Sequence, residues 1–561
     1  MKKRWSIVLC MVMILCSMSA CGKSDANATT AGESVSQASQ AAESTAAGNQ
    51  GSGATLTAGI SGTPDLDPAI ATSTSSLIAM VNLYDTLVYP TADVVEPRVA
   101  EKWEISEDGL TYTFHLKKGI LFHDGSELLA SDVAFSMNRL LTIGEGMAYL
   151  FTDSVDQAEA TDDYTVVFHL KQPFGPFLDS LVRLYIVNEE VVMANKKDGV
   201  YGEAGDYGKA YMVSHDAGSG AYQAVELVQQ DYFLAEKYEN WFMGWSNTQA
   251  PESFKLMEIT EAATVRTMVS SGELDITDQW QSTETLTALS KIDGVKIGEF
   301  SSYKMYNLYY NTQLAPMDDP NFRKAMSCLV DYDMICKSIF VDSVRASSPV
   351  VSSVQGASES FQYSYSLDQA KEYLAASKYA DTYQDYTVEI LCNSDVADLE
   401  KIALMIQSAA SEIGLNIEIS KAPWVSIVDR VGHKDTTPHM LMICSNPMYN
   451  DAGCYLESRY HSKNIGTWEQ GEWLNSKELD QMIEEAMRIV EPEKRYQAYG
   501  AIQDKIVKDL CPTAYLCEFT ERIAYQANNV KWPAMENTAG GEIPNALDGY
   551  MYVFADMAFT K

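Results

Sequence analysis

The sequence predicts an α/β (α+β) protein of two lobes, in which the second lobe is inserted into the first. Three observations predict this class: strand-like segments dominate from residue 55 to about 305, helices and strands alternate from 306 to 515, and strand-like segments then return. The part of the chain from residue 55 to residue 561 is too long for a single hydrophobic core. Two crossings between the lobes would form a hinge, and ligands bind at clefts of this kind.

The segment 96–141 carries the clearest strand and turn signals of the first lobe. Its stretch LTYTFHL alternates, and the apolar residues of one face are Leu110, Tyr112, Phe114 and Leu116. Asp108-Gly109 is a turn signal just before this strand. Ser131 is a good N-cap, so we expect a helix to begin after it.

The segment 386–420 predicts a strand–helix–strand unit in the second lobe. The strand YTVEILC is followed by a helix whose apolar stripe is formed by Ile402, Met405, Ile406, Ala409 and Ile413. Gly414 is placed to end this helix, and the alternating stretch LNIEIS follows. The two strands of such a unit are usually parallel.

The first 20 residues are typical of a secretory signal peptide. Three basic residues precede an uncharged run that is somewhat shorter than the roughly 20 residues needed to span a bilayer. A small-residue pair followed by Cys21 resembles the end of a bacterial lipobox, with Met18 where such motifs usually have Leu. We expect Cys21 to be lipidated and to become the new N-terminus; an ordinary signal peptide or an uncleaved anchor is the alternative.

The composition limits the function classes. The segment 21–54 is rich in Ser, Ala, Thr and Gly and is expected to be a disordered tether. A net charge of −36 disfavours nucleic acid as a partner. The cysteines of the body are odd in number and form no CxxC pair, so we expect no disulfide framework, although one bridge such as Cys444–Cys454 stays open. The seven histidines form no metal-binding pattern, so we expect neither a metal nor a cofactor.

Several segments resemble one known family. The most specific is the long run EPRVAEKWEISEDGLTYTFHLKKGILFHDGSELLASDVAFSMNRL, which starts at Glu96. Shorter ones are DLDP at 65–68, NLYDTLVY at 82–89, GSGAY at 218–222, GELDIT at 272–277 and LYYNT at 308–312. On these segments the chain resembles the solute-binding proteins of peptide-type ABC importers, the dipeptide/oligopeptide/nickel-binding group (family 5).

The resemblance implies the two-lobed periplasmic-binding-protein-like fold, in the class with an extra β-rich subdomain in lobe I. Lobe I would comprise 55–305, with the β-rich subdomain at about 98–217, and the return segment 516–561. Lobe II would comprise 306–515.

The resemblance also implies a binding protein and not an enzyme. The protein would act outside the cytoplasm as a monomer, close its lobes on a peptide or similar small organic solute, and deliver it to the permease subunits in the membrane. Lipidated Cys21 would anchor it to the outer face of the cell membrane. One alternative is a surface hydrolase, although no GxSxG elbow is present; another is a sensing or structural lipoprotein of the same fold.

The resemblance places one set of ligand contacts in MLMICSNPMYNDAGCYL, 440–456. In oligopeptide binders, an Asp in a Trp-x-x-Asp segment here neutralises the amino terminus of the peptide. Ser445 takes the place of that Trp and Met448 that of the Asp. A thioether cannot pair with an ammonium group, so either the ligand lacks a free amine or its charge partner lies elsewhere, for which Asp451 is a candidate. We expect Ser445, Asn446, Met448, Tyr449 and Asp451 to contact the ligand.

Two tryptophans complete the expected site. Trp424 matches a ligand-facing Trp of the oligopeptide binders, and Trp280 follows GELDITDQ at a loop that meets the cleft in the family. An indole ring offers a flat apolar wall and one N–H donor. Packing in the core beside Val425 and Ile427 is the alternative for Trp424.

Overall fold

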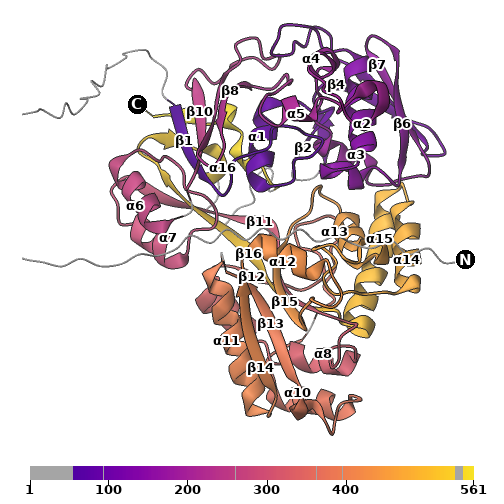
Figure 1. The fold of residues 1–561 in the computed structure, drawn as a ribbon, viewed down its shortest axis with the longest axis vertical. Helices are drawn as coiled ribbons and strands as arrows, with labels where there is room; N and C mark the ends of the chain where they lie inside the picture. Colours follow the sequence, from indigo (N-terminus) through magenta and orange to yellow (C-terminus); the bar gives the residue numbers. More distant parts are fainter. Residues whose placement is uncertain are drawn as a thin grey trace, which may run out of the picture. The chain divides into compact units, whose positions relative to one another are not determined.

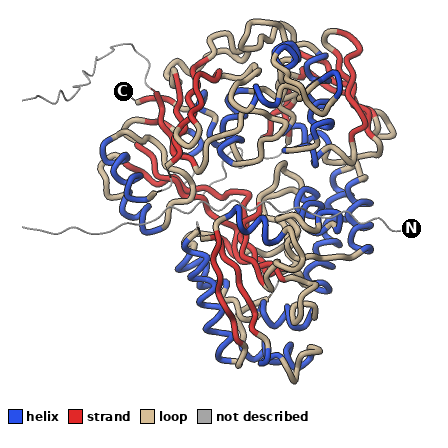
Figure 2. The backbone as a smooth tube through the Cα atoms, viewed as in Figure 1, coloured by secondary structure: helices blue, strands red, loops and turns tan. Residues whose placement is uncertain are grey.

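The computed structural model describes residues 55–91, 94–259, 261–361, 363–394, 396–536 and 547–560 (Figures 1 and 2). All of them belong to one unit, Gly53–Lys561. The expected signal peptide, the lipidation site Cys21 and the tether to residue 54 lie outside the described residues. Helices and sheets are mixed throughout, as expected for the α/β class. We keep the proposed names lobe I, for 55–305 and 516–561, and lobe II, for 306–515.

Lobe I contains two four-stranded sheets. The first has the order β1-β10-β9-β8, with β1 (Thr55–Ile60), β8 (Tyr222–Val228), β9 (Tyr232–Lys237) and β10 (Ser253–Glu258). The second has the order β4-β5-β7-β6, with β4 (Ala100–Ile105), β5 (Thr111–Leu116), β6 (Val155–Asp162) and β7 (Thr165–Leu170). Helix α2 (Ala130–Ile143) packs against β6 and β7.

The alternation read from the sequence is confirmed in β5, where Tyr112, Phe114 and Leu116 are buried. The predicted start of α2 is wrong by two residues. The N-cap position belongs to Leu129 and not to Ser131, because the carboxylate of Asp132 accepts the N–H of Leu129 at 2.9 Å.

A six-stranded sheet carries the chain between the lobes. Its order is β12-β16-β11-β15-β13-β14, with β11 (Val295–Tyr310), β12 (Val344–Arg345), β13 (Thr387–Asn393), β14 (Asn416–Ala422), β15 (Met440–Ser445) and β16 (Thr513–Gln526). β11 and β16 are antiparallel neighbours from the pair Val295–Gln526 to the pair Tyr309–Thr513. The expected lobe boundaries, 305/306 and 515/516, fall inside these two strands, so the two crossings lie side by side in one sheet (Figure 1).

The predicted strand–helix–strand unit is confirmed. β13 and β14 pair in parallel, and α11 (Ala397–Glu412) connects them. Ile402 and Ile406 of its apolar stripe are fully buried. Gly414 follows the helix with φ of 80°, a left-handed conformation that glycine adopts readily and that ends the helix.

The remaining elements are short. Two small two-stranded antiparallel sheets pair β2 (Val88–Pro90) with β3 (Val95–Pro97) and β17 (Val530–Lys531) with β18 (Ala558–Phe559). The other helices of lobe I are α1 (Thr74–Leu83), α3 (Phe177–Ser180), α4 (Glu189–Ala194), α5 (Lys209–Met212), α6 (Ala262–Ser271), α7 (Thr283–Leu289) and α16 (Pro533–Glu536). Those of lobe II are α8 (Pro320–Ser327), α9 (Tyr332–Met334), α10 (Leu367–Ala376), α12 (Trp424–Val431), α13 (Ala452–Tyr460), α14 (Lys477–Met487) and α15 (Pro492–Lys505).

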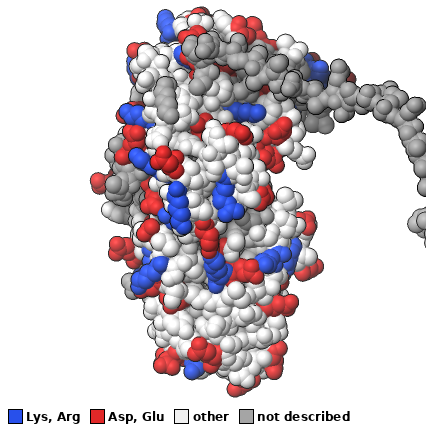
Figure 3. Space-filling view, turned by 90° about the vertical axis from the view of Figure 1, so that its left-hand side faces the viewer, with Lys and Arg blue, Asp and Glu red and all other residues white. Residues whose placement is uncertain are grey.

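The cysteines and the surface fit an acidic globular body. The seven cysteines of the described ranges are unpaired, so Cys444 and Cys454 form no bridge. Among the described helices, none has the length and apolar character that crossing a membrane requires. Figure 3 shows a face on which acidic and basic side chains are interspersed.

Candidate ligand-binding site between the lobes

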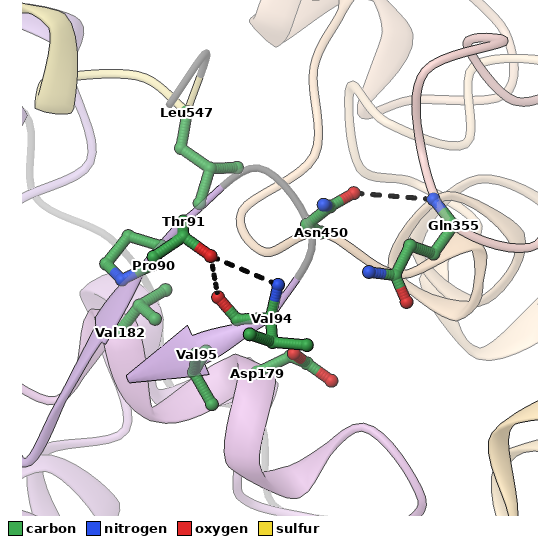
Figure 4. Close-up of a pocket in the computed structure, with 9 residues that line it drawn as sticks. All are labelled: Pro90, Thr91, Val94, Val95, Asp179, Val182, Gln355, Asn450 and Leu547. Atoms are coloured by element: carbon green, nitrogen blue, oxygen red, sulfur yellow. Dashed lines mark hydrogen bonds between the residues drawn. The ribbon is translucent and has the colours of Figure 1, made fainter. Parts of the chain in front are cut away.

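A small cavity lies between the lobes (Figure 4). Its walls are Pro90, Thr91, Val94, Val95, Asp179, Val182 and Leu547 from lobe I and Gln355 and Asn450 from lobe II. Asn450 accepts the backbone N–H of Gln355 at 3.4 Å on the lobe II side. The cavity measures about 10 Å³, room for about one water molecule, whereas a small-molecule site needs hundreds of Å³. The cavity therefore marks where the lobes meet and is not itself large enough for a peptide.

Arg183 of lobe I forms a hydrogen bond across the interface. Its guanidinium is buried, and Nε donates to the carbonyl oxygen of Met448 in lobe II at 2.7 Å. Nη1 donates to the carbonyl oxygen of Asp548 at 3.0 Å, while Nη2 has no hydrogen-bond partner among the described residues. Buried donors are nearly always paired, so this N–H group is available to an acceptor on a ligand or to a water molecule.

A buried ion cluster lies on the crossing strands. Lys304 of β11 is 2.9 Å from the carboxylate of Asp548 and 3.4 Å from that of Glu521 on β16. Burial lowers the pKa of Lys304, but Asp548 and Glu521 outweigh it and raise the pKa overall, so the ammonium stays charged. Asn446 of lobe II donates to Asp548 at 2.9 Å, which connects the cluster to the second lobe.

The two predicted tryptophans are both partly exposed. Trp280 is 38% exposed, and the Lys304 ammonium lies 5.5 Å from its ring centroid, so this indole lies beside the ion cluster. Trp424 is the first residue of α12, is 36% exposed, and packs edge-on against Trp468 at 5.3 Å. Both indoles are therefore partly accessible to solvent.

The predicted residues of 445–449 are mostly enclosed. Ser445 is the last residue of β15 and is buried; its hydroxyl accepts a hydrogen bond from Asn307 of the neighbouring β11 at 2.9 Å. The carbonyl oxygen of Met448 accepts a hydrogen bond from Arg183 of lobe I, and its side chain is buried. Tyr449 is buried, and burial raises the pKa of its phenol.

Asp451 is engaged by the protein itself. Its carboxylate pairs with Arg495 at 3.0 Å and accepts the N–H of Gly453 at 2.8 Å as the N-cap of α13. Both charged side chains are almost fully buried. Because the protein itself supplies both partners of the Asp451 carboxylate, this geometry supports a structural role for Asp451.

Several polar residues of the interface were not predicted from the sequence: Tyr149, Arg183, Lys304, Glu469, Glu521 and Asp548. Lys304 and Arg183 had a usable signal, because each is a single cation inside an apolar stretch, YKMYNLYY and SLVRLYIV. The loop residues Glu469 and Asp548 had none. Within the described residues, no group of three or more His, Cys, Asp or Glu could hold a metal ion.

The comparisons identify the family. Residues 94–467 match the model of the bacterial extracellular solute-binding proteins, family 5, and the chain therefore belongs to this family. Like its relatives, it is a binding protein of the ABC-transporter type and not an enzyme. The sequence-based assignment to this family is confirmed.

Two curated relatives and one solved structure illustrate the likeness. The probable D,D-dipeptide-binding periplasmic protein DdpA of Escherichia coli K12 is 26% identical over 479 residues, which cover 82% of this chain and 87% of that protein. Heme-binding protein A of Haemophilus influenzae is 25% identical over 431 residues, which cover 73% and 76%. The periplasmic binding protein DppA of Helicobacter pylori, solved with the peptide STSA, superposes with a TM-score of 0.76 at 23% identity and covers 91% of this chain and 98% of that one. This last likeness confirms the two-lobed fold.

Proposed function

We propose that the protein captures a peptide between its two lobes and delivers it to the permease of an ABC importer. The family supports this proposal, and so do the names of DdpA and of DppA, which refer to a dipeptide and to a bound peptide. The name of heme-binding protein A keeps a larger ligand among the outcomes of the test. The ligand would lie near Trp280, Trp424 and the loop with Asn446.

One observation carries the proposal: polar groups of both lobes meet at the interface. Arg183 of lobe I reaches the carbonyl oxygen of Met448 in lobe II, and Asn446 of lobe II reaches Asp548. Peptides offer backbone N–H and C=O groups along their whole length, which such polar groups can bind. The crossing strands β11 and β16 give the lobes two adjacent connections about which they can close.

The proposed setting is the outer face of the cell membrane. Cys21 would carry the lipid and residues to 54 would form the tether, and the body would act as a monomer. Native mass spectrometry of protein purified from its own membranes tests this setting together with the ligand. We expect a lipid-modified Cys21 and a co-purified peptide. A chain that still begins at Met1 would contradict the lipid anchor, and a co-purified heme would contradict the peptide ligand.

A ligand screen tests the binding function directly. A ligand that binds only the folded state increases the free energy of unfolding by mass action, by about 2.7 kcal/mol at a concentration of 100 Kd, and so raises the melting temperature. We expect stabilisation by short peptides and none by heme. Stabilisation by heme alone, or by no peptide in a broad library, would refute the peptide assignment.

A further inference from the structure

A short helical turn of lobe II covers the strands on which the chain crosses between the lobes. This π-helical turn, Ile335–Ile339, contacts β16, and the N–H of Phe340 donates to the carbonyl oxygen of Ile335 at 2.8 Å. The ring of Phe340 stacks on Tyr306 of β11 at 4.5 Å and lies edge-on to Phe519 of β16 at 5.5 Å. The turn therefore lies over one face of the sheet, beside the two crossings.

Two cysteines occupy facing positions of this contact. Cys517 of β16 pairs with Tyr306 and lies two residues before Phe519, so these side chains share the face that the turn covers. Cys336 lies in the turn four residues before Phe340, and residues at this spacing lie on the same side of a helical turn. The ring contacts of Phe340 thus place Cys336 over Cys517, and a hydrogen bond joins the two thiols.

Cys444 of β15 is the neighbouring thiol that could compete for Cys517. It also pairs with Tyr306, but from the opposite side of β11. The Cα atoms of Cys444 and Cys517 are therefore about 9.5 Å apart, at twice the spacing of neighbouring strands. Cysteines whose Cα atoms are more than about 7 Å apart cannot be bridged without movement of the backbone. The geometry therefore selects Cys336 as the partner of Cys517.

The two thiols differ in exposure and in acidity. Cys517 is fully buried, whereas Cys336 is partly exposed. The hydrogen bond from the Cys517 thiol lowers the pKa of Cys336. Burial and the charge of Asp333 oppose this change, while the charges of Arg345 and Lys337 reinforce it. The thiolate is the nucleophile in disulfide exchange, so Cys336 is the thiol that reacts first with an external reagent.

We propose that Cys336 and Cys517 form a modification site, at which a low-molecular-weight disulfide such as glutathione disulfide converts the two thiols into one disulfide bond. Cys336 attacks one sulfur of the external disulfide and displaces its first thiol. Cys517 then attacks the Cys336 sulfur of the mixed disulfide and displaces the second thiol. The two protein thiols together lose two electrons, which the external disulfide gains, and their protons pass to the two released thiolates.

This inference goes beyond the proposed function and holds for any ligand. The chain belongs to the bacterial extracellular solute-binding proteins, and disulfides form and persist outside the cytoplasm. The bond would fasten a turn of lobe II to β16 next to the expected boundary 515/516. A cross-link that closes a long loop restricts the unfolded chain, so oxidation should raise the melting temperature by about 3–5 °C.

The test titrates the reduced, purified protein with mixtures of glutathione disulfide and glutathione, once in buffer and once in urea. Free thiols are trapped with N-ethylmaleimide, and peptide mapping by mass spectrometry identifies the linked peptides. The melting temperature is measured before and after oxidation. Cys336→Ser removes one partner of the bond, and Cys444→Ser is the matched control, because it removes the neighbouring thiol that the geometry excludes.

The wild type and Cys444→Ser should yield a peptide pair linked through Cys336 and Cys517. The equilibrium constant for this bond should be larger by about tenfold or more in the folded than in the unfolded protein. In Cys336→Ser, Cys517 should stay reduced and the melting temperature should not respond to the oxidant.

Three results would each overturn the inference. The first is that both thiols of the folded wild type react with N-ethylmaleimide at every ratio of disulfide to thiol. The second is that Cys336 stops at the mixed disulfide with glutathione. The third is that Cys517 is linked to Cys444, or to Cys336 only in urea.

Discussion

At the scale of single residues, Asp451 and Glu469 are two carboxylates of one lobe with opposite situations. Asp451 is paired with Arg495 and caps α13, whereas Glu469 has no partner among the described residues. The sequence could place Asp451 in the loop after β15. It could not reveal Arg495 as its partner, because 44 residues separate them and no local pattern connects such positions.

The pairing of Asp451 predicts a large loss of stability on its neutralisation. In Asp451→Asn the Arg495 guanidinium remains buried without a counter-charge, so we expect the free energy of unfolding to fall by about 3–5 kcal/mol. Asp504→Asn, which breaks an exposed pair with Lys508, should cost no more than about 1 kcal/mol. Urea unfolding of both variants checks this, and a similar small loss in both would contradict the structural role.

Glu469 predicts a pH-dependent difference in stability. Its pKa is raised from 4.5 to about 7, so the folded state holds the proton more tightly than the unfolded state. The stability it contributes is full below about pH 4.5 and is lost as pH rises through about 7. The groups that act on it are Arg459 and Glu457, with Tyr149 and Cys454 nearby.

Glutamine cannot ionise, so the unfolding free energy of Glu469→Gln should increase relative to that of the wild type as pH rises from about 5 to about 8. Chemical unfolding across this range measures the difference. Glu485→Gln, at an exposed residue of α14, should show a constant difference, and the same constancy in Glu469→Gln would mean that the pKa of Glu469 is ordinary.

At the scale of elements, hydrophobic periodicity predicted β5, α11 and the parallel pair of β13 and β14, because these elements bury one face each. It did not delimit β11 and β16, which span 16 and 14 residues. Lys304 and Glu521 interrupt the apolar pattern of these strands, and their burial depends on each other and on Asp548. Long-range ion pairs of this kind leave no periodic signal.

The ion cluster predicts that the crossing strands depend on Lys304. Lys304→Met leaves Glu521 and Asp548 buried without their cation, which should cost about 3–5 kcal/mol of unfolding free energy. The double variant Lys304→Met/Glu521→Gln should recover part of this loss. Urea unfolding of the single and double variants measures both values; additive losses would show that the two side chains are not coupled.

At the scale of the whole molecule, Gly175 is a close contact between the lobes. Its N–H donates to the carbonyl oxygen of Met487 in lobe II at 2.8 Å. A Cβ at this position would overlap the carbonyl oxygen of Ile489 and lie 2.6 Å from Nη1 of Arg495. The present arrangement of the lobes therefore has no room for a side chain here.

Gly175→Ala should consequently weaken ligand binding by about tenfold or more, because it opposes closure without affecting the separated lobes. Gly500→Ala is the matched control, since nothing lies within 4 Å of its added Cβ on α15. Calorimetric titration with a peptide that binds the wild type measures both variants. Unchanged affinity in Gly175→Ala would mean that this contact is not part of the ligand-bound state.

Small-angle X-ray scattering tests the central claim most directly, namely that the two lobes, joined by β11 and β16, close around a ligand. The protein would be stripped of ligand by unfolding and refolding, and its radius of gyration would be compared with and without a peptide that raises its melting temperature. We expect the radius of gyration to fall on peptide addition in the wild type, and to fall less in Gly175→Ala. An identical scattering profile with and without bound peptide would contradict the account.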